Sequence, residues 1–141
     1  SFMFSECKLP EDFSLGECFN TSRVTDMSGM FNKCKLPKGF SLGECFDTGN
    51  VTDTENMFAF CKLPEAFSLG EHFDTSKVTD MRGMFWECEL PRDFSLGEHF
   101  NIRKATEMKF MFCKCAYNGI SIYDYFETYD DKEIIEKLRK H

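Results

Sequence analysis

A repeat of 27 residues dominates this sequence, and it constrains the fold more than any other feature. Aligned copies read KLPxxFSLGExFxTxxVTDMxxMFxxC. The cysteine that closes each copy recurs at Cys7, Cys34, Cys61, Cys88 and Cys115. This period is too long for a coiled-coil heptad and too short for a propeller blade of roughly 40 residues. It favours a stack of coils in which every recurring position becomes a column through the molecule.

Within one copy, the pattern predicts a strand and a helix. Phe13 and Leu15 alternate with polar residues, which is typical of a short, half-buried strand, and Gly16 follows as a repeated corner. In residues 24–34 the apolar side chains are spaced by three or four, which favours a short helix over SGMFNKC. The Leu-Pro pair that comes next would end this helix.

The repeat weakens towards the C-terminus, and the chain divides accordingly. We predict a repeat domain over residues 1–115 with an incomplete first coil, a degenerate last coil over 116–129, and an amphipathic capping helix over 130–141. The predicted fold class is therefore an α/β solenoid of about five 27-residue coils, built from short strands and short helices with a C-terminal cap. Because the first coil is incomplete, we expect either a longer array or self-association through the uncapped N-terminal coil.

The segments FNTSRVTDMSGMFNKC at 19–34 and FDTSKVTDMRGMFWEC at 73–88 resemble the BspA-like repeats of bacterial surface proteins. This family is of the leucine-rich-repeat type, and the resemblance covers about residues 1–115. The chain departs from it by carrying KLPEDFSLGE where the family has a serine- and leucine-rich strand. The resemblance implies a stacked binding scaffold at the cell surface or in a secreted protein, often with an adhesive role, and no catalytic residues.

The charge balance argues against several classes of partner. The formal net charge is -7, which disfavours a nucleic-acid or anionic-membrane surface. No stretch approaches the roughly 18 apolar residues of a membrane span, so we expect no membrane insertion. Unpaired cysteines would also suit a reducing cytoplasm, which leaves that compartment open.

The eight cysteines favour buried thiols over disulfides, because one cysteine per coil at one phase gives parallel side chains. A second column contains ligands that zinc accepts. Its members are Cys18, Cys45, His72 and His99. A column spreads ligands along a line instead of converging them, so Cys45, His72 and His99 are weak metal candidates and we expect no cofactor.

Two further sets of residues are candidates for binding. Phe60 and Trp86 are large apolar residues at positions that are polar or small in other copies, so they are candidate contact anchors, with packing against a neighbouring coil as the alternative. An acidic column could meet a basic partner or simply form a solvated face. It consists of Glu17, Glu44, Glu71 and Glu98. The column at Asp26 is expected to accept hydrogen bonds from the backbone at a helix start.

These observations predict a non-catalytic scaffold that binds a protein or host-surface ligand. Nothing in the repeat places a nucleophile, a base and an orienting acid together, so we expect no enzyme. Two alternatives remain open: a structural spacer within a longer array, and a metal-binding module that uses the Cys/His column.

Overall fold

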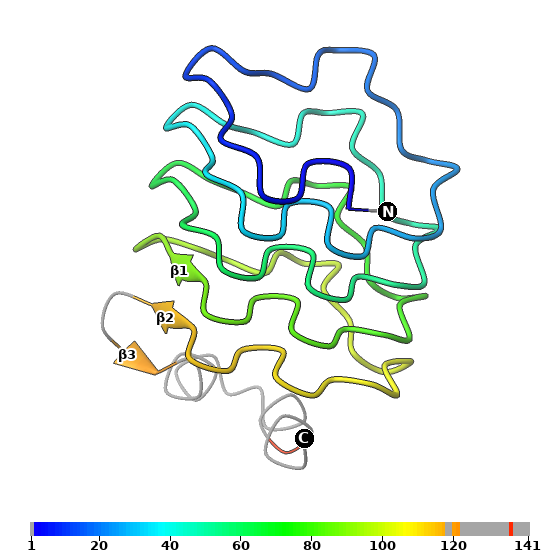
Figure 1. Ribbon diagram of the computed structural model, residues 1–141. Coiled ribbons are helices and arrows are strands. Elements are labelled where there is room, and N and C mark those ends of the chain that lie inside the picture. Colours follow the sequence, from blue (N-terminus) through cyan, green and yellow to red (C-terminus); the bar gives the residue numbers. More distant parts are fainter. Residues whose placement is uncertain (1, 118–119, 122–135, 137–141) are drawn as a thin grey trace.

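The computed structural model describes residues 2–117, 120–121 and 136. The chain winds into coils that lie one above another from the N-terminal end towards the C-terminal end (Figure 1). Parallel bridges join Lys8 to Lys35, Asp26 to Asp53 and Asp53 to Asp80. Residues that stand 27 positions apart in the sequence are therefore neighbours in space.

Regular secondary structure is sparse in the described residues. There are three strands, each of two residues: β1 (Glu89–Leu90), β2 (Ala116–Tyr117) and β3 (Ile120–Ser121). β1 pairs with β2 in parallel, and β2 pairs with β3 antiparallel. The predicted α/β solenoid of short strands and short helices is therefore wrong as a fold class.

The segment that was expected to be a helix forms a chain of tight turns instead. Within residues 27–34, the N–H groups of Met30, Asn32 and Cys34 donate to the carbonyl three residues earlier, at 2.9–3.2 Å. The alternate N–H groups point to the next coil: those of Met27 and Phe31 donate to the carbonyls of Asp53 and Met57, both at 2.9 Å. A helix would use every one of these donors within the same segment.

Left-handed backbone explains why the helical spacing of apolar residues does not produce a helix. Gly29 and Lys33 have φ of 58° and 54°, and the equivalent residues of the other coils are also left-handed. An α-helix cannot continue through such residues. The buried side chains Met27, Met30 and Phe31 still face the core, because the turns repeat at a similar interval.

We call this part of each coil the ladder segment; it comprises residues 2–7, 27–34, 54–61, 81–88 and 108–115. The opposite part, which we call the groove segment, comprises residues 13–17, 40–44, 67–71 and 94–98. Phe40 and Leu42 are buried in it and Ser41 is exposed, so the predicted alternation holds. No strand forms there, because among the described residues no backbone hydrogen bond joins neighbouring groove segments.

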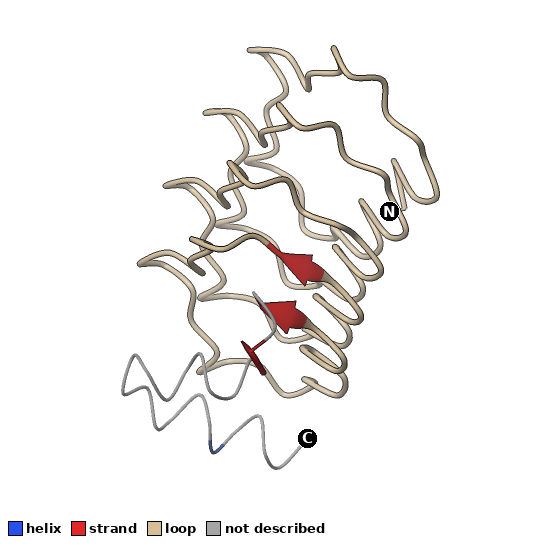
Figure 2. Ribbon diagram, turned by 90° about the vertical axis from the view of Figure 1, so that its left-hand side faces the viewer, coloured by secondary structure: helices blue, strands red, loops and turns tan. Residues whose placement is uncertain are grey.

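The core between the two segments consists of stacked phenylalanines. Rings of the ladder column, such as Phe31 and Phe58, stack at 5.4–5.7 Å between centroids. Rings of the groove column, such as Phe40 and Phe67, stack at 6.3–6.5 Å. The coils are therefore closer on the ladder side, and Figure 2 shows them crowding along one edge and spreading along the other.

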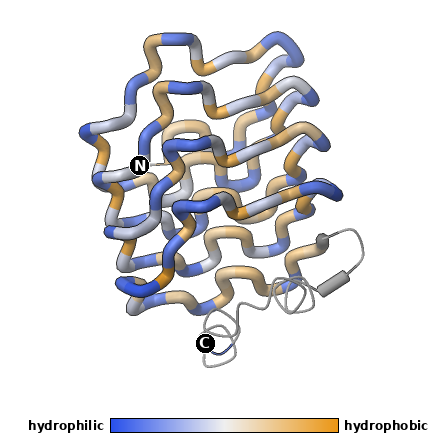
Figure 3. Tube along the Cα trace, turned by 180° about the vertical axis from the view of Figure 1, so that it is seen from behind, coloured by the Kyte–Doolittle hydropathy of each residue, from blue (hydrophilic) through white to orange (hydrophobic). Residues whose placement is uncertain are grey.

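Hydrophobic and hydrophilic residues keep the same order along successive coils (Figure 3).

Buried threonines form hydrogen bonds between neighbouring coils a few residues after the groove segment ends. The Thr75 hydroxyl donates to the carbonyl of Asn101 at 2.8 Å and accepts from the Asn101 N–H at 2.6 Å. Thr21 bonds Asp47 in the same two ways. At this point the coils are joined by these side-chain bonds together with one longer backbone bond, as from the Thr75 N–H to the His99 carbonyl at 3.2 Å.

Of two predictions about local features, one is confirmed and the other is confirmed only in part. The repeated glycine corner is confirmed, since Gly16 and its three equivalents have φ of 79–82°. Asp26 does accept a backbone N–H, from Ser28 at 2.8 Å, but no helix begins there. Apart from residue 136, the predicted capping helix over 130–141 lies outside the described residues, as does most of the predicted degenerate coil over 116–129.

Candidate binding surface

Three aromatic side chains from successive coils form a strip on the outside of the ladder segments. The ring of Trp86 lies 4.9 Å from that of Phe60 and 5.6 Å from that of Phe110, between centroids. Phe60 and Phe110 are 37% and 47% exposed, and Trp86 is half-buried. Phe60 and Phe110 are two of the four exposed large apolar side chains among the described residues.

The turns of the ladder segment explain why these rings face outward. Phe58 is fully buried, while Phe60, two residues later, sits at a left-handed position with φ of 58°. Phe110 occupies another left-handed position, with φ of 61°, where two other coils have glycine. Backbone strain of this kind in non-glycine residues is kept only where the surroundings hold it, here by the inter-coil hydrogen bonds.

Charged side chains surround the aromatic strip. The Lys33 ammonium lies 5.9 Å from the centre of the Phe60 ring, and the Lys109 ammonium lies 5.0 Å from that of Phe110. Ion pairs lie beside it, such as Lys114 with Glu87 at 2.9 Å. An apolar centre with a charged rim is the usual anatomy of a protein-binding patch.

The sequence analysis proposed Phe60 and Trp86 as contact anchors, and the structure places both at the surface and in contact with each other. Whether they bind a partner stays a prediction. Phe110 was not predicted, because it does not lie between the repeated phenylalanine and cysteine, where the copies differ most visibly. Its column reads Phe2, Gly29, Asn56, Gly83 and Phe110, so a bulky residue among glycines was the available signal.

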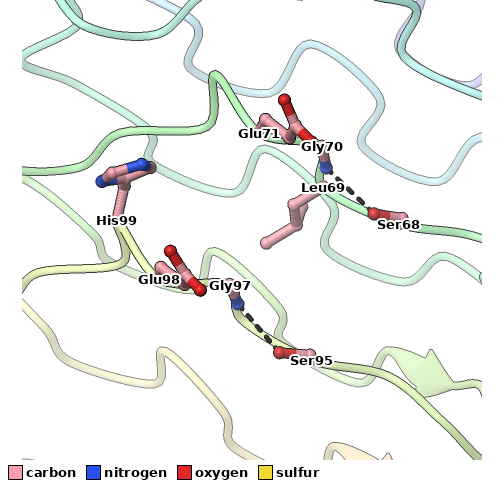
Figure 4. Close-up of a pocket in the computed structure, with 8 residues that line it drawn as sticks. All are labelled: Ser68, Leu69, Gly70, Glu71, Ser95, Gly97, Glu98 and His99. Carbon is pink, nitrogen blue, oxygen red and sulfur yellow. Dashed lines mark hydrogen bonds between the residues drawn. The ribbon is translucent and has the colours of Figure 1, made fainter.

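The acidic column lies in the groove segments, on the side of the molecule opposite the aromatic strip. Glu71 and Glu98 face a groove between two neighbouring coils, together with Ser68, Ser95 and His99 (Figure 4). The Ser68 and Ser95 hydroxyls accept the N–H groups of the glycines that follow, at 3.1 and 3.0 Å. Equivalent grooves carry Glu44 with Glu71 and Glu17 with Glu44.

These glutamates differ from other acidic residues of the described surface. All four are exposed, and none forms an ion pair with a described residue. By contrast, Glu89 pairs with Lys62 at 2.9 Å and Glu55 with Arg82 at 3.1 Å. The acidic column therefore gives the groove side a net negative potential.

The structure does not gather the proposed metal ligands into one group. Cys45, His72 and His99 are exposed on three successive coils, and among the described residues they form no cluster of three ligand atoms. A different cluster occurs: ligand atoms of Asp53, Glu55 and Asp80 lie within 4.8 Å of one another. Arg82 occupies this cluster, with bonds to Asp80 at 2.6 Å and to Glu55 at 3.1 Å.

The cysteines of the repeat are small core residues in the inner coils. Cys34, Cys61 and Cys88 are almost completely buried. Burial raises the pKa of the Cys61 thiol to about 12, and the thiol donates to the Phe31 carbonyl at 2.9 Å. The prediction that this column consists of buried thiols is confirmed for these three residues.

Coils that repeat every 27 residues and stack through parallel bridges place this chain among repeat proteins. Comparison with protein families agrees at that level: residues 1–125 match the family described as "Mycoplasma protein of unknown function, DUF285", and the chain belongs to this family. The finer resemblance to BspA-like repeats is not part of that match. Neither the curated proteins nor the solved structures contain a significant match. In the described residues, no helix has the length and apolar character to cross a bilayer.

Proposed function

We propose that this chain is a non-catalytic scaffold that binds another protein or a host-surface ligand through the aromatic strip of Phe60, Trp86 and Phe110. The observation that carries the proposal is that these rings, from three successive coils, touch one another at the surface. Exposed aromatic groups inside a polar rim are typical of sites where a few residues dominate binding energy.

The arrangement of the rings favours a protein over a sugar as the ligand. A sugar ring stacks on the open face of an aromatic side chain. Trp86 has a ring neighbour from the coil before it and another from the coil after it, and its plane lies within 22° of that of Phe110. One face of Trp86 is therefore used by Phe110, and the tilted Phe60 ring, at 50°, crowds the indole from the other neighbouring coil. The strip thus suits an apolar pocket on a folded partner.

The resemblance of the VTDM and MF segments to BspA-like repeats supports an adhesive role in a surface or secreted bacterial protein. We include that location in the proposal. The competing role of a spacer without a partner would not require exposed aromatic side chains, which carry a risk of aggregation.

The experiment is a binding screen of the full chain against an array of host-surface proteins and glycans. The variant F60S/W86S/F110S is expected to lose binding to a protein on the array, because it removes the apolar anchors. The variant K38S/K104S changes two exposed residues away from the strip and is the matched control. Thermal unfolding of both variants shows whether the fold is retained. Unchanged binding by the folded triple variant, or no binding by the parent chain, overturns the proposal.

A further inference from the structure

Two exposed thiols occupy one column on neighbouring coils, on the groove side. Cys18 and Cys45 are both free and both exposed. Each comes directly after a glutamate of the acidic column, Glu17 or Glu44. The next two coils have His72 and His99 at this position, so the pair of thiols is confined to this end of the column.

The distance between the coils at this column decides what could join the two sulfurs. The adjacent rings of Phe19 and Phe46 are nearly parallel, 13° apart, with centroids at 6.5 Å. Because these rings are equivalent, nearly parallel and directly after the two cysteines, we take their separation as the distance between the coils at this column. A disulfide needs Cβ atoms about 3.5–4.5 Å apart, so the two coils would have to approach by about 2 Å to form one.

A metal ion held between the two sulfurs fits this distance better. With bonds as long as the Zn–S bond, about 2.3 Å, two metal–sulfur bonds in a line span about 4.6 Å. Parallel side chains on coils separated by this translation reach that span when each sulfur leans about 1 Å towards the other, which a change of χ1 provides. Both side chains are exposed, so neither is held by core packing.

The charge and the chemistry of the site favour a soft cation. Glu17 and Glu44 are exposed and form no ion pair in the described part of the chain, so their carboxylates attract a cation to the groove rim. Thiolate ligands select soft ions, of which Cu(I) is the common biological example. Hard ions such as Mg²⁺ and Ca²⁺ prefer oxygen ligands in larger number.

We propose that Cys18 and Cys45 form a two-coordinate site for a soft monovalent cation of the Cu(I) type. On binding, each thiol releases its proton to water, and each sulfur donates an electron pair to the ion. Two protons leave, and the S–Cu–S unit carries one negative charge. No oxidant or reductant takes part. The site lies apart from the aromatic strip and does not depend on the proposed function.

The remaining cysteines provide internal controls. Cys34, Cys61 and Cys88 lie inside the core, so ions in solution do not reach their thiols. Cys113 is half-buried on the ladder side, far along the chain from the proposed pair. The variant Cys113→Ser therefore removes one thiol without touching the proposed site.

The experiment is an anaerobic titration of the full chain with Cu(I) in competition with a chromogenic Cu(I) chelator. We expect one tightly bound ion per chain. Because even partners of metal ligands change affinity by about 10- to 100-fold, Cys18→Ser and Cys45→Ser should each lower it by more than about 100-fold. Cys113→Ser should leave it unchanged. Thermal unfolding of each variant shows that it is folded.

Two results would overturn the assignment. One is a tight site that survives Cys18→Ser but is lost in Cys45→Ser and His72→Ala, which would place the ion one coil further along the column. The other is equal affinity in all three serine variants, which would mean that Cu(I) binds single thiols without a paired site.

Discussion

The ladder and groove segments belong to the same coils, yet they tie those coils together in different ways. In the ladder segments, backbone N–H groups donate to the next coil at 2.7–2.9 Å, as from Gly29 to Glu55 and from Phe60 to Trp86. The groove segments have no such backbone bonds among the described residues, and the coils are about an ångström further apart there, 6.3–6.5 Å against 5.4–5.7 Å between rings.

One side of the stack is therefore joined by a continuous set of backbone bonds. The other is joined mainly by side chains, with a single longer backbone bond beyond each groove segment, as from Thr75 to His99 at 3.2 Å. Phenylalanines of the two columns meet edge to face across the core, as Phe58 and Phe67 do at 5.7 Å. A rigid ladder side can hold aromatic side chains in strained, outward positions. An open groove side leaves room between coils for water or ligands.

The largest effect on the free energy of unfolding should come from removing a buried phenylalanine ring from either side of the core. Phe58→Ala and Phe67→Ala each remove a buried ring, which typically lowers the free energy of unfolding by about 3–5 kcal/mol. We expect Phe58→Ala to cost more, because the hydrogen-bonded ladder prevents the coils from closing on the cavity. Urea denaturation of both variants measures the difference. Equal losses would show that the two sides are equally stiff.

A smaller effect is expected from the threonine tie at the end of the groove segment. Thr75→Val keeps the shape but leaves the N–H and C=O of Asn101 without their partner, which should lower the free energy of unfolding by about 1–3 kcal/mol. Thr79→Val is the matched control, because the exposed Thr79 hydroxyl makes one 3.2 Å bond to Thr52. If both substitutions cost the same, the groove side does not depend on this tie.

Alkaline pH should weaken the ladder side through its buried thiols. Burial raises the pKa of Cys61 from 9.0 to about 12, so the thiol stays protonated in the folded chain while it ionises in the unfolded chain. Stability from this group is complete below pH 9 and is lost as pH rises towards 12. At pH 10 the loss is on the order of 1 kcal/mol for such a thiol.

Denaturation curves at pH 8 and pH 10 test this expectation. Cys61→Ala should show a smaller fall in the free energy of unfolding between the two pH values than the parent chain. Cys45→Ala removes an exposed thiol and is the control. An identical fall in Cys61→Ala and in the parent chain would argue against a buried, protonated thiol at this position.

The sequence allowed some of these features to be predicted and hid others for physical reasons. The period of 27 predicted which residues become neighbours, and the alternation of Phe40, Ser41 and Leu42 predicted which of them are buried. The prediction of a helix over residues 28–34 was wrong. Apolar spacing shows which side chains face the core, but it does not show which N–H groups bond within the segment. Only Gly29 hinted at the left-handed turns, since Lys33 adopts one without any sign in its residue type.

The candidate surface was also predictable only in part. Phe60 and Trp86 stood out by differing from their equivalents, and the structure places them in contact. That Phe110 joins them depends on a turn that brings a different column to the same patch, which linear alignment of the copies does not show.

The smallest effects should come from two glycines that share a left-handed backbone but differ in their surroundings. Gly70, at the groove corner, has φ of 82° and open space where a Cβ would lie. Gly83, in the ladder segment, has φ of 56°, and an added Cβ would collide with the side-chain oxygen of Asn56 in the coil before it. Each replacement by alanine should cost about 1 kcal/mol from the backbone, and Gly83→Ala should cost more because of the collision.

A double-mutant cycle separates these two causes. In the background of Asn56→Ala the colliding oxygen is absent, so Gly83→Ala should cost less than it does in the parent chain. Gly70→Ala should cost the same in both backgrounds, because nothing occupies the space at the groove corner. If Asn56→Ala changes neither cost, then the Asn56 side chain moves aside freely and the close packing of the ladder side is softer than its hydrogen bonds imply. If it changes only the cost at Gly83, contact between coils restricts substitution on the ladder side, while backbone conformation alone restricts it at the groove corner.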